Sequence, residues 1–372
     1  MRIAYLCADP GIPVRGCKGA SVHLRSLAAA LHRRGHDVLL AATTIEGDEP
    51  APRGVVMEPL PSDEAEATAW LTTGLRDWRA DVVLERYSLK SGAGVDVAHR
   101  LGLNFVLEVN APLVDEAARY RGLTDVQTWL VREKALLLAS DQVVAVSNGV
   151  RDHVLLSGVP RSRVVVIRNG VDLDLFAAGR GNAVRRRYGL RSKAVIGFAG
   201  SLKAWHGVRT LVLALAGLPE NVHLLVVGDG PQREEIEALA TALHVIPRLR
   251  MAGAVAHERM PDYLASMDIA VAPYEPQPSF YFSPLKVMEY MAAGLPVVAS
   301  NQGDLAEIIG DAGVLVPPGD EPALRDALNR LVRSEPRRRE LSLRARRRAQ
   351  AMSWDGVAQE VERVLLPKAI AA

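Results

Sequence analysis

The sequence predicts an α/β protein with two doubly wound parallel-sheet domains and a central cleft between them. Short apolar segments rich in Val, Ile and Leu alternate with helical segments, which is typical of parallel sheets covered on both faces. An opening pattern of strand, glycine-containing loop and helix begins near residue 3 and recurs near residue 195. The chain has 372 residues, which suffices for two domains of ordinary size.

In the first half, a strand is expected at residues 3–7, followed by a loop rich in Gly and Pro. The next helix is expected from about Ser21, because apolar residues recur at helical spacing up to Leu31. Gly35 is expected to end it. The remaining strands of this half are expected at 38–41, 82–84, 105–109, 143–146 and 164–167.

The second half repeats this arrangement. A strand is expected near residues 195–199, and the helix after its loop runs through Leu211 and Leu215. Further strands are expected at 222–227, 269–272 and 297–299.

A glycine-containing segment near residues 176–182 predicts the domain boundary. We therefore expect an N-terminal domain of residues 1–178 and a C-terminal domain of residues 179–352. A final helix over about 353–372 is expected to cross back onto the first domain.

Composition excludes several classes of protein. The net charge is +2, from 45 basic and 43 acidic residues, which argues against a dedicated nucleic-acid binder. Cys7 and Cys17 are the only cysteines, so a disulfide framework and a cysteine-based zinc site are excluded. The start of the chain does not resemble a signal peptide, and no apolar run approaches the ~20 residues of a membrane span. We expect a cytoplasmic protein.

Residues 279–300 carry the strongest functional signal. Ser283 suits a helix N-cap and Pro284 the first helical position. The amides of the first turn, at Leu285 and Lys286, would then face outward at the positive end of the helix dipole. Lys286 adds a charge, and Glu289 lies on the same helix face as a hydroxyl acceptor. This combination suits a sugar nucleotide, whereas the alternative is an exposed ion pair between Lys286 and Glu289.

Several motifs, in this order and spacing, resemble the retaining glycosyltransferases of the GT-B fold, specifically the fourth family (glycosyl transferases group 1). The GT-B fold consists of two Rossmann-like domains. The segments that carry the resemblance are 16–23, 146–151, 167–172 followed by Phe176, 200–207, 227–231 and 279–300.

The resemblance implies that the second domain binds a nucleoside diphosphate sugar and the first domain an acceptor. Gly200 and Ser201 would lie under the pyrophosphate, Glu289 would hold the ribose, and residues 251–255 would read the base. The expected catalytic residues are His23, Asn110 and Lys286. The expected donor-binding residues are Gly16, Lys18, Gly19, Gly200, Ser201, Lys203, His206, Gly253, Val255, Ser283, Leu285, Lys286 and Glu289.

The sequence departs from the family pattern at three places. Ser201 and His206 stand where the family has an arginine and a lysine that bind the diphosphate, and Lys203 or Lys286 could supply the charge, with Lys286 favoured. Tyr281 replaces a glutamate that contacts the transferred sugar. Asn110 replaces a histidine near the anomeric centre, and a neutral amide can orient a hydroxyl but cannot act as a cation.

Some residues allow two interpretations. His23 would contact the donor or acceptor, or be a surface histidine at a helix start. His206 would change charge near neutral pH, or pack beside Trp205. Glu108 would be a cleft acid, or a strand-end carboxylate held by backbone amides. Asp172 and Asp174 are expected to cap a helix rather than to bind a metal ion.

The arginines at 337–339 and 344–348 are expected to form a solvated helix face, with contact to anionic lipid as the weaker interpretation.

We expect a retaining glycosyltransferase that transfers a sugar from a nucleoside diphosphate sugar, with UDP favoured, to an acceptor hydroxyl. No metal, cofactor or nucleic-acid partner is expected. The alternatives are a sugar-nucleotide isomerase on the same fold and a non-catalytic protein that binds a nucleotide sugar and partners another chain. A nicotinamide dehydrogenase is disfavoured, because no G-x-G-x-x-G follows an expected strand. The acceptor, whether lipid, glycan or natural product, is not encoded in any motif.

Overall fold

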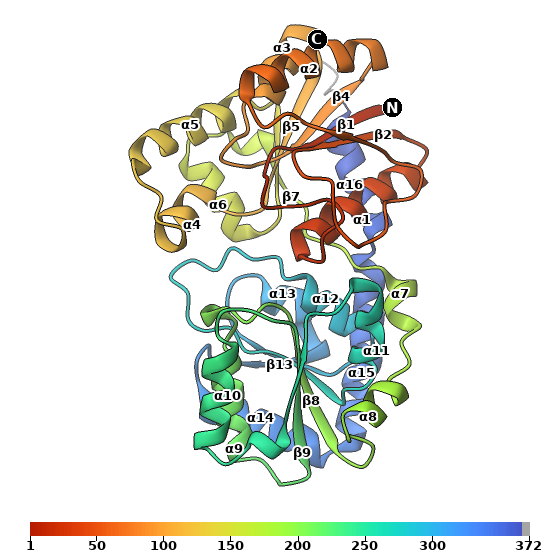
Figure 1. Cartoon of the computed structure of the whole chain (residues 1–372), viewed down its shortest axis with the longest axis vertical. Coiled ribbons are helices and arrows are strands. Elements are labelled where there is room, and N and C mark those ends of the chain that lie inside the picture. The colour runs from red at the N-terminus through yellow and green to blue at the C-terminus, as the bar shows by residue number, and fades with distance from the viewer. Residues whose placement is uncertain (367–372) are drawn as a thin grey trace. The chain divides into compact units, whose positions relative to one another are not determined.

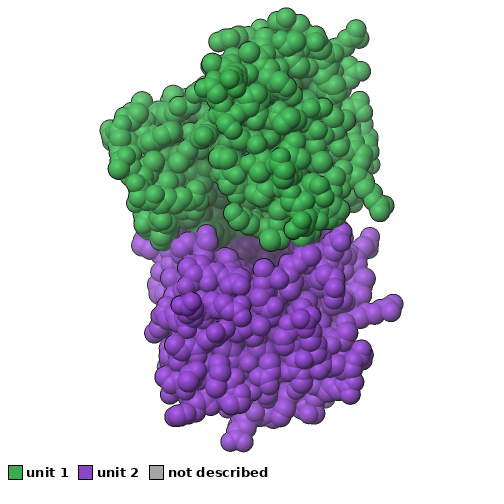
Figure 2. Space-filling view, in the orientation of Figure 1, with its two compact units in different colours: residues 1–170, 281–283, 354–372 green, residues 171–280, 284–353 purple. Residues whose placement is uncertain are grey.

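A computed structural model describes residues 1–366. The part of the expected C-terminal helix at 367–372 lies outside the described residues. The described chain divides into two compact units, coloured separately in Figure 2. Unit 1 contains Met1–Gly170, Tyr281–Ser283 and residues 354–366, and unit 2 contains Val171–Phe280 and Pro284–Ser353.

Within the described residues, unit 1 contains a seven-stranded parallel sheet with the strand order β3-β2-β1-β4-β5-β6-β7. Its strands are β1 (Arg2–Cys7), β2 (Asp37–Ala42), β3 (Val56–Pro59), β4 (Val82–Arg86), β5 (Asn104–Val109), β6 (Gln142–Ala145) and β7 (Val164–Val166). The order reverses at β1, which pairs with β2 on one side and β4 on the other; Tyr5 lies level with Leu40 and Leu84. Such a reversal is where doubly wound sheets bind ligands.

Helices cover both faces of this sheet (Figure 1). They are α1 (Gly19–Arg33), α2 (Glu64–Trp78), α3 (Ala93–Leu101), α4 (Leu113–Tyr120), α5 (Val126–Ala139), α6 (Asn148–Leu156), the 3-10 turn η1 (Arg161–Arg163) and α16 (Trp354–Leu365). The C-terminal α16 buries Trp354, Val357 and Val361, and it packs against α1 and β5.

Within the described residues, unit 2 contains a six-stranded parallel sheet with the order β10-β9-β8-β11-β12-β13, so its reversal falls between β8 and β11. Its strands are β8 (Ala194–Ala199), β9 (Val222–Val227), β10 (Leu249–Gly253), β11 (Ile269–Ala272), β12 (Val297–Ser300) and β13 (Gly313–Val316). Its α-helices are α7 (Leu173–Ala177), α8 (Asn182–Arg187), α9 (Val208–Ala216), α10 (Arg233–Ala242), α11 (Met260–Leu264), α12 (Leu285–Ala292), α13 (Leu305–Ile309), α14 (Glu321–Arg333) and α15 (Glu335–Ala349). Its 3-10 turns are η2 (Ala204–His206), η3 (Ile246–Arg248), η4 (His257–Arg259), η5 (Gly310–Ala312) and η6 (Gln350–Met352).

These sheets confirm the predicted α/β class with two doubly wound units, and every strand expected from an apolar run is present. Three strands were not predicted: β3, β10 and β13. Each lies at the edge of its sheet, where one side faces solvent, and most of their residues are exposed or half-buried. β3 and β10 lack a continuous run of apolar side chains, which makes their sequence signal weak, whereas β13 has the short run Val-Leu-Val and was overlooked.

The boundary in the structure falls between Gly170 and Val171, whereas the sequence placed it at 178/179. The Val171 N–H donates to the carbonyl of Met352, and Val171 also forms an isolated bridge with Ser353. These contacts join Val171 to unit 2. The described part of the C-terminal helix, α16, belongs to unit 1.

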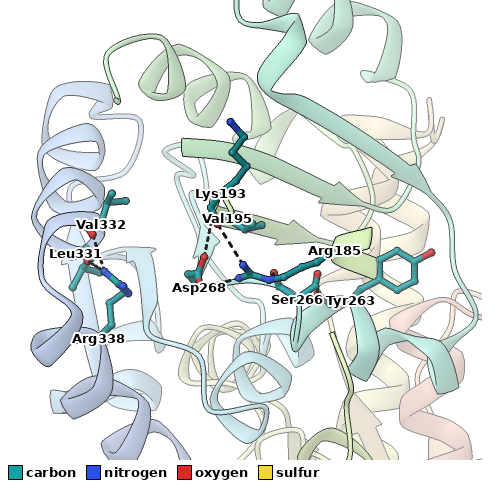
Figure 3. Close-up of polar contacts among 9 residues, drawn as sticks. All are labelled: Arg185, Lys193, Val195, Tyr263, Ser266, Asp268, Leu331, Val332 and Arg338. Atoms are coloured by element: carbon teal, nitrogen blue, oxygen red, sulfur yellow. Dashed lines mark hydrogen bonds and ion pairs between the residues drawn. The ribbon is translucent and has the colours of Figure 1, made fainter. Parts of the chain in front are cut away.

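The amino ends of the central strands of unit 2 are held by an ion-pair network, shown in Figure 3. Arg185 of α8 donates to Asp268 Oδ1 (2.9 Å) and to the carbonyl of Ser266 (2.9 Å). Asp268, just before β11, accepts the N–H of Val195 in β8 (2.7 Å). Because β8 and β11 are adjacent, this network fixes the start of the two strands that flank the reversal.

The basic helix α15 uses its arginines to satisfy carbonyl groups. Arg338 donates to the carbonyls of Leu331 and Val332 at the C-terminus of α14 (2.6 and 2.8 Å), also visible in Figure 3. Arg348 donates to the carbonyl of Ile308 (2.6 Å). Helix C-termini leave carbonyls without intrahelical partners, so these side chains complete neighbouring helices. The prediction of a simply solvated arginine face was therefore incomplete. Among the described helices, none combines the length and apolar character of a membrane span.

Candidate functional site

The centre of the candidate site is Lys286, in the first turn of α12. Its Nζ lies 4.3 Å from the ring centroid of Phe198 in β8 and 5.3 Å from that of Tyr274, just after β11. The ammonium group therefore lies at the reversal point of the second sheet. Among the described residues, Nζ is screened from solvent and has no hydrogen-bond partner.

Burial sets the electrostatics of this lysine. Removal from water disfavours the charged form and lowers the pKa of Lys286 to about 7, although Glu289 opposes the shift. The alternative interpretation, an exposed ion pair between Lys286 and Glu289, does not hold, because Glu289 is hydrogen-bonded to His257. Because this ammonium group faces two aromatic rings and has no hydrogen-bond partner in residues 1–366, its donors are available for an anion.

The absence of a side chain at Gly200 makes room for Lys286. Gly200 follows β8 with a φ of +140°, and a Cβ placed there would lie 2.7 Å from Lys286 Nζ. Its N–H donates to the carbonyl of Val227 at the end of β9 (2.9 Å). The loop therefore needs glycine for both its backbone conformation and its contact with the lysine.

The loop after Gly200 shows which environment His206 has. The Nδ1–H of His206 donates to the carbonyl of Ser201 (2.5 Å), and the ring packs edge-on to Trp205. Burial and the charge of Lys286 lower the pKa of His206 to about 2. Of the two interpretations of His206, the structure therefore supports a neutral ring packed beside Trp205 rather than a group that titrates near pH 7. Lys203 stacks over the Trp205 ring at 4.7 Å.

Glu289 pairs with a histidine that the sequence analysis missed. His257 Nε2 lies 3.0 Å from Glu289 Oε1, and Glu289 is buried. His257 opens η4, in the loop after β10, and its ring packs against Phe176. Because β10 was not predicted as a strand, its loop was not identified as part of the carboxyl edge. The same loop contains Val255, which is half-buried, and follows Gly253, which has a φ of +75°.

The start of α12 also differs from expectation. Pro284, rather than Ser283, is the N-cap residue, and the helix begins at Leu285 with no side-chain cap. Ser283 belongs to unit 1, where its hydroxyl accepts the N–H of Asn169 (3.1 Å). The Nδ2 of Asn169 also donates to the carbonyl of Ser283 (2.5 Å). These bonds occupy the hydroxyl that was expected to cap the helix.

Tyr281 is likewise held within unit 1. Its hydroxyl donates to Glu116 Oε2 (3.1 Å), and its carbonyl accepts from Ser147 Oγ (2.6 Å). Ser147 comes from the Ser-Asn-Gly motif and caps α6. Segment 281–283 is therefore anchored to unit 1 at both ends.

His23 lies in a buried polar network rather than at the surface. Its Nε2 is 2.6 Å from Glu108 Oε1 and its Nδ1 is 2.6 Å from Asn169 Oδ1. Trp354 packs edge-on against the ring. Both ring nitrogens are thus engaged within unit 1, and this geometry favours a positioning role over the direct substrate contact that was predicted.

Glu108 is the hub of this network. It accepts hydrogen bonds from the Tyr5 hydroxyl and from Asn110 Nδ2, each at 2.6 Å. Burial raises the pKa of Glu108, but His23, Arg86 and Tyr5 outweigh burial and lower it to about 2. Side chains hold this carboxylate, which differs from the second of the two interpretations, a carboxylate held by backbone amides.

Asn110 is oriented by Glu108, and the described residues offer no hydrogen-bond partner to its buried Oδ1. The other residues predicted in unit 1 lie in the loop before α1 and at its start. Arg25 donates to the carbonyl of Gly16 (2.6 Å), Lys18 Nζ donates to the carbonyl of Gly11 (3.2 Å), and Gly19 begins α1.

Asp172 caps α7 by accepting the N–H of Leu175 (3.0 Å), as expected. Over residues 1–366, no group of three or more His, Cys, Asp or Glu side chains is arranged to hold a metal ion.

Two Rossmann-like units, with a lysine of buried Nζ in the first turn of a helix at a sheet reversal, are typical of the GT-B fold. Structures of the same fold include the Anabaena protein HepE in complex with UDP and glucose (TM-score 0.80, 21% identity, 98% of this chain and 99% of that chain). The lipopolysaccharide glycosyltransferase WaaG is also similar (TM-score 0.75, 20% identity, 98% and 100% coverage).

The chain belongs to glycosyltransferase family 4 (glycosyl transferases group 1). The family model "Glycosyltransferase Family 4" matches residues 18–175, and "Glycosyl transferases group 1" matches residues 193–334. A D-inositol 3-phosphate glycosyltransferase of Xylanimonas cellulosilytica is 33% identical over 75% of this chain and 70% of that protein. A GDP-mannose-dependent alpha-mannosyltransferase of Mycobacterium tuberculosis is 30% identical over 92% and 91%.

Proposed function

We propose that this glycosyltransferase transfers a sugar, with retention of anomeric configuration, from a UDP-sugar to an acceptor hydroxyl. The observation that carries the donor assignment is Lys286, a buried ammonium without a hydrogen-bond partner among residues 1–366, at the start of α12. Unit 2 would bind the donor and unit 1 the acceptor.

The elements around Lys286 fit the parts of a nucleoside diphosphate. The diphosphate would accept hydrogen bonds from Lys286 and from the first-turn amides of α12, beside the Gly200 loop. Glu289, oriented by His257, would accept from the ribose hydroxyls. The edge strand β10 and Val255 would contact the base, and Ser201, Lys203 and His206 would line the loop at the diphosphate. His206 would contribute there as a neutral group.

UDP is favoured because the HepE structures of similar fold contain UDP, UDP with glucose, or UDP-glucose. GDP is the competing base, because a 30%-identical relative is named for its dependence on GDP-mannose. Direct binding measurements with UDP and GDP distinguish these two nucleotides.

Electrostatic stabilisation of the leaving group would dominate the mechanism. As the glycosidic bond to the diphosphate breaks, negative charge grows on the departing oxygen, close to Lys286 and the α12 amides. That oxygen would take the acceptor's proton on the same face of the sugar, so no protein nucleophile is required. Asn110, held by Glu108, would orient a sugar or acceptor hydroxyl. His23 would position Glu108 and thereby Asn110.

The donor assignment is tested by thermal unfolding with UDP, GDP, ADP, CDP and dTDP. A ligand at about 100 times its dissociation constant stabilises by about 2.7 kcal/mol, and we expect UDP to give the largest shift. Lys286→Ala and Glu289→Ala should lose the shift. Lys193→Ala, which removes a lysine from the opposite edge of the same sheet, is the matched control. A flat response of the wild type to all five nucleotides would overturn the proposal.

Product analysis separates the remaining activities. Conversion of the donor without an acceptor would identify a sugar-nucleotide isomerase, and nucleotide binding without transfer or hydrolysis would identify a non-catalytic binding protein. Retention is checked by the anomeric configuration of the transferred sugar. The proposal includes metal-independent activity in the cytoplasm, and transfer should therefore persist in EDTA.

A further inference from the structure

A pocket lies at the carboxyl edge of the sheet in unit 1, and none of the site residues assigned above lines it. It is bordered by the ends of β1 to β4 and covered by α2 and α3. The pocket therefore lies at the reversal point of the first sheet, the position where doubly wound folds bind ligands.

Two oxygen atoms that line this pocket have no hydrogen-bond partner among the described residues. They are Oε2 of Glu85, at the end of β4, and Oγ1 of Thr43, just after β2. Glu85 is only 2% exposed. Both oxygens can accept hydrogen bonds, and an unsatisfied buried polar atom is costly. The pocket therefore suits a ligand that donates hydrogen bonds.

The lining contains three carboxylates, of Asp63, Glu64 and Glu85, against one lysine, Lys90, so its net charge favours a cationic donor. Two of these carboxylates already have partners, because Asp63 caps α2 and Glu64 forms an ion pair with Arg132 (2.7 Å). Glu85 forms no ion pair with any described residue. Burial raises the pKa of Glu85 to about 7, with Ser91 opposing and Glu64 reinforcing the shift. A cation beside Oε2 would favour the ionised carboxylate.

The dimensions restrict the ligand group. The free space is about 20 Å³, and a single water-sized group needs roughly 10–15 Å³. Gly94, in the first turn of α3, makes room for the Glu85 carboxylate at the pocket wall, because a Cβ there would lie 2.0 Å from Glu85 Oε2. One small functional group fits, whereas a sugar ring does not.

We propose that this pocket binds a primary ammonium group of an amine-bearing ligand, which donates hydrogen bonds to Glu85 Oε2 and Thr43 Oγ1. The identification of that ligand as the acceptor rests on the proposed function; the binding of the ammonium group does not. The acceptor would then be an amino sugar or aminocyclitol rather than a neutral polyol.

The test compares glucosamine with glucose, two sugars that differ by one ammonium group in place of a hydroxyl. Binding to the nucleotide-free full chain is titrated at neutral pH by ligand-observed NMR. Glucosamine should bind at least about tenfold more tightly, as expected for a hydrogen bond to a charged group. Since no nucleotide is present, failure here is distinguishable from failure of the donor site.

Glu85→Gln should abolish the preference for glucosamine, because the amide keeps the shape of the side chain but not its charge. Glu66→Gln is the matched control: it removes a carboxylate from exposed α2 without changing the pocket lining. Thr43→Val, on the other side of the pocket, should weaken glucosamine binding several-fold and serves as a second probe if the Glu85 variant fails to fold. Equal binding of the two sugars, binding of neither, or a preference that survives both pocket substitutions would overturn the proposal.

Discussion

The two edges of the sheet in unit 2 differ in how their charged side chains are paired. At the amino edge, Arg185 and Asp268 pair with each other and with strand backbones. At the carboxyl edge, the Lys286 ammonium group is shielded from water between two rings, and no partner for it occurs in residues 1–366. Both sets of charged residues lie at the ends of the adjacent strands β8 and β11. The ion pair at the amino edge stabilises the folded unit, whereas the lysine without a partner at the carboxyl edge favours the binding of an anionic ligand.

The largest effect is expected for Lys286→Met. Transfer should fall by at least about 10²-fold, because the group that stabilises the leaving diphosphate is lost. The ligand-free protein should instead become more stable. The unfolded lysine, with its pKa near 10.5, binds more protons at neutral pH than the folded one, with its pKa of about 7, so the folded state carries a cost.

The measurement pairs steady-state kinetics with thermal unfolding. We expect the melting temperature without nucleotide to rise by about 2 °C or more. A variant with unchanged nucleotide affinity would show that Lys286 is structural, as Arg185 is.

Gly200→Ala should weaken nucleotide binding by about tenfold, because the new Cβ would displace Lys286 Nζ. Gly189→Ala is the matched control: Gly189 also has a positive φ, of +68°, but a Cβ there meets nothing within 4 Å. Calorimetric titration with UDP measures both. If the two variants lost equal affinity, backbone strain rather than the contact with the lysine would be responsible.

The affinity for UDP should fall as the pH rises above about 7, by up to about tenfold per pH unit. The anion binds to the protonated lysine, and the pKa of Lys286 is about 7 in the free protein. His206 should not contribute, since its pKa of about 2 keeps it neutral throughout this range. Titrations between pH 7 and 9 should show the slope in the wild type and no slope in Lys286→Met. A slope retained by that variant would assign the titration to another group.

The smallest effect on binding is expected at the amino edge. Asp268→Asn should leave the UDP dissociation constant within about twofold, while lowering the free energy of unfolding by about 1–2 kcal/mol, because charge-assisted hydrogen bonds to Arg185 and Val195 are weakened. Urea unfolding and UDP titration of the same sample test this. A large loss of affinity would mean that the two edges are coupled.

The sequence predicted the architecture because central parallel strands such as β8 and β9 are continuous buried runs. It predicted the position of Lys286 because a proline-started helix before a buried strand is a local pattern. It did not predict the partners of Glu289 or Ser283, because His257 and Asn169 come from distant segments. It also could not place Glu85, since one acidic residue in an apolar strand does not show which neighbours enclose it.

The assignment of α16 to unit 1 has a consequence for synthesis on the ribosome. Unit 1 is the first to leave the ribosome, but it is completed last. Its α1 and β5 lack the helix that covers them until Trp354 to Leu365 have been synthesised. At 5–20 residues per second, the interval between Gly170 and Leu365 is roughly 10–40 s. During that time unit 1 exposes to solvent, and to any chaperone nearby, the apolar surface against which Val357 and Val361 later pack.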